Sequence, residues 1–325
     1  MNTPYLSIED LHVQFNTYAG IVRAVNGVGF DIRSGEMFGL VGESGCGKTV
    51  TGLAILRAIP PPGRIMKGRI FFNGEDLITK SESEMRDIRG GRIAMIFQDP
   101  TASLNPVFSV GYQISLQITQ HRHVSKKEAK QLALAMFSEV GLPHAKSTYN
   151  AYPHELSGGM QQRVMIAMAL ASGAELLIAD EPTTALDVTI QAQILALLSQ
   201  LRESEGLTIL LITHDLGVVA ETCDRVAVTY NGRIVETGTV DDVLYKTKHP
   251  YTQGLMAALP DSVDHSRPLQ VIKGNVPDGL RSVTGCSFHP RCQAVMDICR
   301  EQKPLHIHMG NQGHTAACFL YEEVK

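Results

Sequence analysis

Apolar and polar residues alternate along the chain in a pattern typical of an α/β protein. Short apolar runs predict buried strands, and stretches with helical spacing lie between them, which favours a largely parallel sheet. The predicted strands are Met37–Val41, Ile93–Phe97, Leu176–Ala179 and Thr208–Ile212. In addition, Arg225–Tyr230 and Arg233–Glu236 flank Asn231-Gly232, a pair of residues typical of a two-residue hairpin.

Three further stretches depart from this pattern. Leu6 to Ile32 alternates polar and apolar residues, which predicts an antiparallel region. Residues 99–158 lack strand signals, and Lys126–Val140 has its apolar residues at helical spacing, so we expect a helical subdomain there. After about residue 245 the chain becomes rich in proline, cysteine and histidine. We therefore expect a main domain over residues 1–250 and a C-terminal extension over residues 251–325.

Composition and charge exclude several classes of protein. The 325 residues are 44% hydrophobic and carry a net charge of −4, so the basic surplus of a nucleic-acid-binding protein is missing. Apolar runs fall short of the roughly 18 residues that a membrane-spanning helix needs. The first ten residues lack the basic and apolar regions of a signal peptide. We expect any membrane role to depend on a partner.

A glycine-rich segment follows the first predicted buried strand and opens a helix. It matches the phosphate-loop pattern G-x-x-x-x-G-K-[ST], in which glycines let backbone N–H groups surround phosphates and the helix N-terminus adds a positive dipole. Lys48 is expected to reach the outer phosphates, and Thr49 to bind Mg²⁺. The predicted nucleotide-binding residues of this segment are Gly42, Glu43, Ser44, Gly45, Cys46, Gly47, Lys48, Thr49 and Val50.

Two acidic residues follow the predicted strand Leu176–Ala179. Ligands of parallel sheets bind at the carboxyl ends of strands. Asp180 suits coordination of Mg²⁺ through a bound water, and Glu181 suits orienting the water that attacks a terminal phosphate. Two acids after a strand are also typical of an ordinary solvated strand end. The phosphate-loop pattern upstream favours the catalytic interpretation.

A third motif, Leu-Ser-Gly-Gly-Met-Gln-Gln-Arg, runs from Leu156 to Arg163. Ser157 could cap the following helix and leave its N–H groups open to an anion, although an ordinary loop-to-helix junction fits equally well. Together with the two motifs above, the string resembles the signature sequence of ABC transporter ATPases. The resemblance covers residues 1 to about 250. It implies a P-loop NTPase (RecA-like) cassette with an antiparallel β-subdomain and a helical subdomain, which binds ATP with Mg²⁺ and hydrolyses it.

The resemblance also implies roles for single residues. Gln98 matches the glutamine that contacts Mg²⁺ and senses the membrane subunits, and His214 matches the histidine that touches the terminal phosphate. Phe15 matches the aromatic residue that stacks on adenine, with Tyr18 a nearby alternative. Ala185-Leu186-Asp187 matches the loop that crosses the dimer interface. The implied catalytic residues are Glu181, His214 and Gln98, the Mg²⁺ ligands are Thr49, Gln98 and Asp180, and the residues that bind nucleotide from the opposite subunit are Ser157, Gly158, Gly159 and Gln161.

The segment His249-Pro250-Tyr251, followed by Ala258-Leu259-Pro260, resembles the start of the tail in dipeptide/oligopeptide importer ATPases. The implied function is powering peptide uptake, although importers of nickel and other solutes share the element. The implied partners are two membrane-spanning permease subunits, a second homologous ATPase, and an extracytoplasmic peptide-binding protein reached through the complex. No nucleic acid is expected, and the chain would work at the cytoplasmic face of the cell membrane.

Two alternatives come from other classes of function. One is an ABC ATPase that acts on ribosomes or DNA, but such proteins usually carry two cassettes or a long coiled-coil insertion. The other is a nucleotide-binding module without hydrolysis, which the intact Glu181 and His214 argue against.

Four of the six cysteines crowd the C-terminal extension with the spacing C-x5-C-x6-C-x18-C. Four thiolates suit an iron–sulfur cluster, and the resemblance to dipeptide importer ATPases, some of which carry one, supports a [4Fe–4S] cluster of structural role. A Zn²⁺ site is the alternative, although zinc ribbons prefer C-x2-C pairs. Disulfides or free thiols are a third possibility. The expected ligands are Cys286, Cys292, Cys299 and Cys318.

Overall fold

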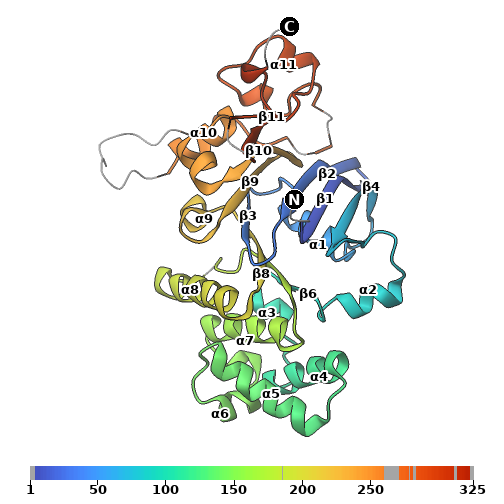
Figure 1. Ribbon diagram of the computed structural model, residues 1–325, viewed down its shortest axis with the longest axis vertical. Helices are drawn as coiled ribbons and strands as arrows, with labels where there is room; N and C mark the ends of the chain where they lie inside the picture. The colour runs from blue at the N-terminus through green and yellow to red at the C-terminus, as the bar shows by residue number, and fades with distance from the viewer. Residues whose placement is uncertain are drawn as a thin grey trace. The chain divides into compact units, whose positions relative to one another are not determined.

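The computed structural model describes residues 4–184, 186–259, 271–277, 279–280, 283–310 and 313–322. Ala185 and Pro260, to which the sequence assigned roles, lie outside the described residues. The chain divides into two compact units (Figure 1). The first comprises the described parts of residues 1–32, 38–78 and 213–325, and the second comprises residues 33–37 and 79–212.

The first unit contains an antiparallel sheet whose strands follow the order β2-β1-β4-β5. Its inner positions are apolar, since Leu6, Ile8, Leu11 and Val13 of the first strand are almost fully buried. The antiparallel region predicted from Leu6 to Ile32 is therefore confirmed, whereas the strand β4 was not predicted. The strands are β1 (Leu6–Thr17), β2 (Gly20–Ile32), β4 (Gly63–Phe72) and β5 (Glu75–Asp76).

A second group of strands in this unit mixes both directions. Its strands are β3 (Met37–Val41), β9 (Arg225–Tyr230), β10 (Arg233–Thr239), β11 (Ile307–His308) and β12 (Thr315–Ala316). β3 pairs with β9 in parallel, and the pairs β9–β10, β10–β12 and β12–β11 are antiparallel. Asn231 and Gly232 have φ values of 48° and 71°, as a type I′ turn requires, so the predicted hairpin is confirmed.

The helices of the first unit are short. They are α1 (Lys48–Ile55), α9 (Leu216–Thr222), η2 (Asp241–Tyr245), α10 (Pro250–Ala257), η3 (His289–Arg291), α11 (Ile298–Glu301) and η4 (Phe319–Tyr321). Tyr251 of α10 and Phe288 belong to the same buried core as Val41 of β3 and Val226 and Tyr230 of β9. Residues on both sides of position 250 thus share one core, and the boundary placed there stays a prediction.

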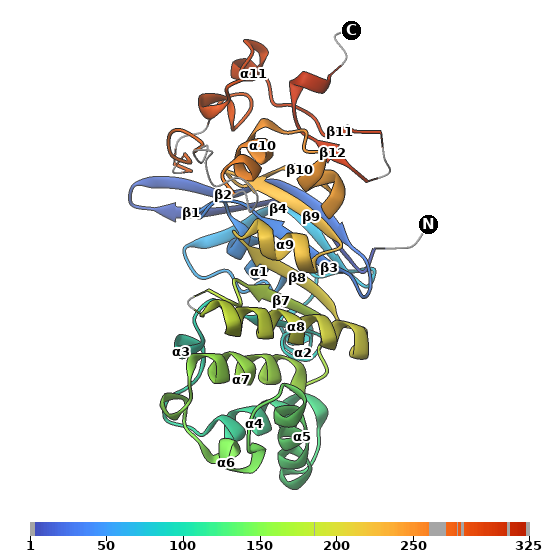
Figure 2. The ribbon, with the colours of Figure 1, turned by 90° about the vertical axis from the view of Figure 1, so that its left-hand side faces the viewer.

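The second unit contains the parallel strands β6 (Ile93–Ile96), β7 (Leu176–Asp180) and β8 (Thr208–Thr213), in the order β8-β7-β6. Every residue of β7 and β8 is buried, which explains their continuous apolar sequence. Several helices lie between β6 and β7, where the helical subdomain over residues 99–158 is predicted, and the bounds of that subdomain stay a prediction (Figure 2). The helices of the second unit, of which α2 precedes β6 and α8 follows β7, are α2 (Glu82–Ile88), α3 (Pro100–Ser103), α4 (Val110–Arg122), α5 (Lys126–Glu139), α6 (Ala145–Asn150), η1 (Pro153–Glu155), α7 (Gly158–Ala171) and α8 (Val188–Glu205).

Among the helices that the structure describes, none has the length and apolar character that crossing a lipid bilayer requires.

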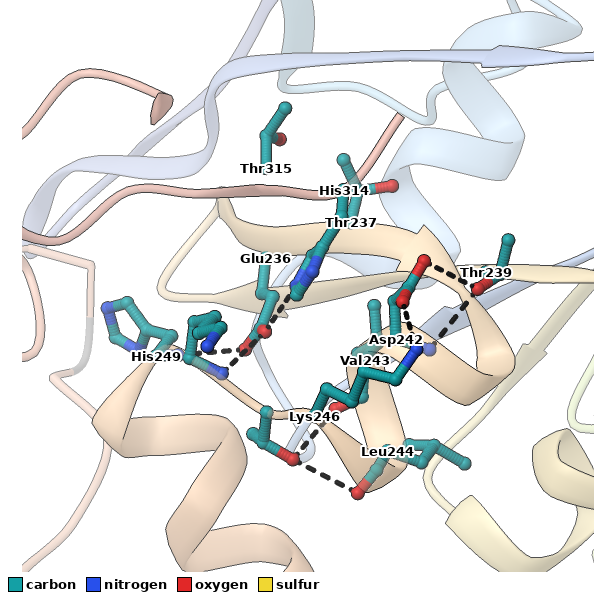
Figure 3. Close-up of polar contacts among 12 residues, drawn as sticks. Glu236, Thr237, Thr239, Asp242, Val243, Leu244, Lys246, His249, His314 and Thr315 are labelled. Atoms are coloured by element: carbon teal, nitrogen blue, oxygen red, sulfur yellow. Dashed lines mark hydrogen bonds and ion pairs between the residues drawn. The ribbon is translucent and has the colours of Figure 1, made fainter. Parts of the chain in front are cut away.

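A buried carboxylate attaches the C-terminal segment to strand β10. The Glu236 side chain is fully buried and accepts hydrogen bonds from the backbone N–H groups of Lys248 (2.8 Å) and His249 (2.9 Å). Its Oε1 also lies 2.9 Å from Nε2 of His314 (Figure 3). A buried carboxylate is stable only when it is paired in this way. Glu236 therefore ties two distant parts of the C-terminal segment to the sheet.

We expect Glu236→Gln to destabilise the fold. Glutamine has the same shape as glutamate, but its NH₂ group cannot accept a hydrogen bond from the backbone N–H groups that face this side chain. At least one buried hydrogen bond is therefore lost, at a cost of about 1–3 kcal/mol. The free energy of unfolding is measured by chemical denaturation. Glu301→Gln, on the exposed surface of α11, is the matched control. Equal stability of the two variants would contradict the attachment role of Glu236.

Candidate functional site

The glycine-rich loop between β3 and α1 is shaped by close backbone contacts. Gly47 has φ 95°, a left-handed conformation that favours glycine, and a Cβ there would lie 2.2 Å from the carbonyl oxygen of Ala24. A Cβ on Gly42 would lie 2.2 Å from the carbonyl oxygen of Thr229. Larger residues at either position would displace the loop, so these two glycines set its path.

Lys48 begins α1 and places its ammonium group across the loop. Its Nζ donates to the carbonyl oxygens of Gly42 (2.7 Å) and Glu43 (3.1 Å), and the residue is 6% exposed. Thr49, in the first turn of the same helix, is exposed. The Cys46 side chain is buried, and burial raises the pKa of its thiol. Cys46 therefore contributes to the loop through its backbone.

The loop borders a hollow of about 280 Å³ lined by Val41, Gly42, Glu43, Ser44, His214 and Leu255. The sequence assigned His214 to the terminal phosphate from its place after a strand. The structure brings His214 to the same hollow as the loop, and its contact with phosphate stays a prediction.

The second unit brings together the acidic pair and Gln98. Asp180 ends β7 and is 3% exposed. Glu181 follows it with φ 47°, which is unusual for a residue other than glycine. Its Oε2 accepts hydrogen bonds from Nε2 of Gln98 (3.1 Å) and from the hydroxyl of Thr184 (2.9 Å). Gln98 and Glu181 thus form a connected pair, although 83 residues separate them in the sequence.

The third motif forms the N-terminus of α7. Ser157 caps the helix, its Oγ accepting from the N–H of Met160 at 3.4 Å, and Ser157 and Gly158 are exposed. Gly159 lies against Ile190, whose Cγ2 would be 2.8 Å from an added Cβ. Gln161 is buried, and its amide donates to the carbonyl oxygens of Pro153 (2.8 Å) and Leu156 (3.2 Å). We therefore interpret the Gln161 side chain as a support for the segment before the helix.

The aromatic residue assigned to adenine is partly buried. Phe15 and Ile59 lie close to Gly63, since a Cβ on this glycine would come within 2.5 Å of each side chain. Tyr18, the alternative, is fully exposed. Adenine stacking by Phe15 stays a prediction.

Two side chains of the C-terminal segment contact the glycine-rich loop, and the sequence did not indicate either contact. The Tyr251 hydroxyl accepts a hydrogen bond from the Glu43 N–H at 3.0 Å. The Arg291 guanidinium pairs with the Glu43 carboxylate at 2.7 and 3.1 Å. Each pair is more than 200 residues apart in the chain. The only sequence signal was that both residues lie within motifs of the extension.

The expectation of a metal-binding extension is not supported by the structure. Among the described residues, no group of three or more His, Cys, Asp or Glu side chains is arranged to hold a metal ion. The four tail cysteines nevertheless line one pocket of about 10 Å³, together with His249 and His289. Burial raises the pKa of Cys318 to about 11, and burial is also the main cause that raises the pKa of Cys286. The residues concerned are Cys286, Cys292, Cys299 and Cys318.

Comparison with known proteins supports the reading of the motifs. The family described as "ABC transporter" matches residues 25–184, and "Oligopeptide/dipeptide transporter, C-terminal region" matches residues 235–299. Among solved structures, the chain is similar to the ATP-binding cassette MJ0796 bound to ADP and Pi, with 26% identity and a TM-score of 0.65 over 72% of this chain and 98% of that one. The cbiO1 structure from Clostridium perfringens gives 28% identity and a TM-score of 0.64 over 76% and 93% of the two chains.

Curated relatives match over nearly the whole length. The probable peptide ABC transporter ATP-binding protein y4tR of Sinorhizobium fredii is 50% identical over 98% of this chain and 96% of its own. The dipeptide transport ATP-binding protein DppD of Bacillus subtilis is 47% identical over 98% and 95%. The corresponding DppD of Escherichia coli is 45% identical over 96% and 95%. This chain therefore belongs to the ATP-binding subunits of ABC transporters, an ATPase family, and within it to the group that carries the oligopeptide/dipeptide transporter C-terminal region.

Proposed function

We propose that this chain hydrolyses ATP to power the uptake of dipeptides or oligopeptides by an ABC importer. The observation that carries the proposal is the similarity of 45–50% identity to peptide transporter subunits, which extends across both the nucleotide motifs and the tail. Importers of nickel or other solutes are the second candidate for the cargo. The tail match to the oligopeptide/dipeptide region favours peptides.

The proposed reaction is the attack of water on the terminal phosphorus of ATP. The bond to the bridging oxygen breaks, and phosphate separates from ADP. The Glu181 carboxylate orients the water and accepts its proton, while Gln98, hydrogen-bonded to it at 3.1 Å, holds that carboxylate in place. Lys48 and the backbone N–H groups of the glycine-rich loop bind the phosphate oxygens, and His214 contacts the terminal phosphate.

Three oxygen-bearing side chains suit Mg²⁺, a hard cation that prefers oxygen ligands. They are the Thr49 hydroxyl, the Gln98 amide oxygen and the Asp180 carboxylate. The ion would neutralise charge that develops on the phosphate oxygens. In the proposed dimer, the Ser157–Gly159 segment of a second subunit, in which Ser157 and Gly158 are exposed, closes over the same phosphate, so ATP favours the closed state and ADP does not.

The proposed partners are those that the resemblance to peptide importer ATPases implies. They are two membrane-spanning permease subunits, a second homologous ATPase, and an extracytoplasmic peptide-binding protein that reaches this chain through the complex. The chain would act at the cytoplasmic face of the membrane as a peripheral subunit. No nucleic-acid partner is proposed, since the net charge is −4.

An exposed apolar surface in the second unit fits a cytoplasmic loop of a permease. Phe97, Val107, Phe108, Tyr112 and Leu116 are each 44–72% exposed, and the rings of Phe108 and Tyr112 lie 5.2 Å apart. Concentrated exposed apolar side chains of this kind are typical of protein interfaces. Phe97 directly precedes Gln98 in the chain, so a loop bound at Phe97 would be positioned to influence the Gln98–Glu181 pair.

We expect Glu181→Gln in the reconstituted importer to retain ATP binding and lose turnover by about 100-fold or more, because the amide cannot accept the proton. ATP-driven uptake of a labelled dipeptide into vesicles should stop, and the closed ATP-bound dimer should accumulate. Isolation of that dimer identifies whether the partner is a second ATPase. Unchanged turnover in Glu181→Gln would refute the catalytic assignment, and uptake of nickel in place of peptide would refute the cargo.

We expect Phe108→Ala combined with Tyr112→Ala to weaken binding to the permease subunits by about 10-fold or more, since exposed aromatic residues commonly dominate interfaces. ATP binding by the isolated chain should not change. Co-purification with the membrane subunits measures the effect. Tyr245→Ala, which removes an aromatic residue 72% exposed in the first unit, is the control. Normal assembly of the double variant would exclude this surface as the docking site.

We also propose that the four tail cysteines hold a [4Fe–4S] cluster. The support is that all four line one pocket and that a cluster binds each thiolate through a different iron, which places them farther apart than four thiolates on one zinc. The cluster would stabilise a segment with little regular structure.

Anaerobically purified protein should be brown, absorb near ~400 nm and contain iron and sulfide. Replacing any one of the four cysteines by serine should lower the cluster content, whereas Cys223→Ser should not, because Cys223 lies outside this group. A colourless protein with stoichiometric zinc would overturn the cluster proposal. A tail that stays folded and active without any metal would overturn a metal site of either kind.

A further inference from the structure

Glu43, between Gly42 and Ser44 of the phosphate loop, is held by an arginine from the far end of the chain. Arg291 Nη1 lies 2.7 Å from Glu43 Oε2, and Arg291 Nη2 lies 3.1 Å from Glu43 Oε1. This two-point pairing fixes both the distance and the plane of the carboxylate. The Arg291 side chain is 5% exposed and the Glu43 side chain 31%, so solvent screens this contact less than it screens an ion pair on the open surface.

Arg291 is itself fixed by other groups of the C-terminal segment. Its Nε donates to the carbonyl oxygen of Lys273 at 3.1 Å, and Nη2 also approaches that of Ile272 at 3.3 Å. Its guanidinium lies 5.7 Å from the ring centroid of Tyr230. A lysine would keep the charge but could not form the planar fork that satisfies all these partners together. The contact therefore depends on arginine and not on positive charge alone.

Tyr251 holds the backbone of the same loop residue. Its hydroxyl accepts from the Glu43 N–H at 3.0 Å, and its ring is fully buried against Tyr230 and Phe288, with centroids 4.7 and 5.3 Å away. Burial raises the pKa of this phenol, so it remains neutral. The C-terminal segment thus contacts Glu43 twice, with Tyr251 at its backbone N–H and with Arg291 at its carboxylate.

The contact continues to the lysine of the phosphate loop. The Glu43 carbonyl oxygen accepts a hydrogen bond from Lys48 Nζ at 3.1 Å. At its other end, Arg291 directly precedes Cys292, which lines the cysteine pocket. A continuous series of contacts therefore leads from that pocket through Arg291 and Glu43 to Lys48.

We propose that Arg291 and Tyr251 are positioning residues that hold the phosphate loop in the shape that binds ATP. The C-terminal segment then sets the affinity of the cassette for nucleotide, although neither residue itself contacts the phosphates. Since the loop binds the phosphates before the reaction, loss of these contacts weakens ATP binding and raises KM more than it lowers kcat.

The test measures the Kd of the full-length chain for ATP, together with KM and kcat in the assembled transporter. Arg291→Lys and Glu43→Gln should each raise Kd and KM by about 10-fold with kcat changed less than about 2-fold. The double variant should be no weaker than either single variant, because both remove the same contact. Arg300→Lys, an exposed arginine of α11, is the matched control.

A second variant covers the case in which Arg291→Lys disturbs folding of the tail. Tyr251→Phe keeps the buried ring and removes only the hydroxyl that accepts from Glu43, and it should raise Kd for ATP several-fold, by about 3-fold or more. Unchanged Kd and KM in Tyr251→Phe, or effects of Arg291→Lys and Glu43→Gln that add independently, would overturn the proposal. So would a lower Tm without any change in ATP affinity, because that result describes a purely structural contact.

Discussion

The aromatic packing of Tyr230, Tyr251 and Phe288 is the interaction on which the first unit depends. Tyr230 ends strand β9, Tyr251 lies in α10, and Phe288 precedes the short helix η3, yet their rings meet within 4.7–5.3 Å. Burial of three large rings removes much apolar surface from water and thereby favours docking of the C-terminal segment. This cluster also contacts the phosphate loop, because the Tyr251 hydroxyl accepts a hydrogen bond from the Glu43 N–H.

Polar contacts define where that segment docks. The hydrophobic effect has little directional preference, whereas a buried carboxylate such as Glu236 accepts only donors at defined positions. Glu236 accepts a hydrogen bond from the backbone N–H of His249 with one carboxylate oxygen, and its other oxygen contacts the ring of His314. His249 in turn accepts from the Tyr251 N–H through Nδ1, and burial lowers the pKa of His249 to about 3, so the ring stays neutral and able to accept. In the His-Pro-Tyr element, His249 therefore caps helix α10, while the Tyr251 ring packs against Tyr230 and its hydroxyl binds Glu43.

The sequence predicted the parts of this structure that local patterns control. The buried strands at Met37–Val41 and Thr208–Ile212 were evident because parallel strands covered on both faces are continuously apolar. The hairpin at Asn231-Gly232 was evident because few residues adopt its left-handed turn. Contacts such as Arg291 with Glu43 could not be predicted, since no local pattern records a pairing across 248 residues. The contacts of Gln161 with the preceding loop were not predicted for a related reason: a glutamine within a conspicuous motif looks the same whether its amide faces a ligand or that loop, and its assignment to the nucleotide stays a prediction.

The left-handed backbone of Glu181 has a consequence for how this protein tolerates change. A residue other than glycine or asparagine at φ 47° carries a conformational cost of about 1 kcal/mol or more. Glycine at this position would relieve that strain but would remove the carboxylate to which we assign the orientation of the attacking water. Selection for thermal robustness and selection for turnover therefore act in opposite directions at one residue. Variants of this chain selected for thermal stability alone, without a screen for ATP consumption, are therefore expected to include substitutions of Glu181 that abolish its proposed role.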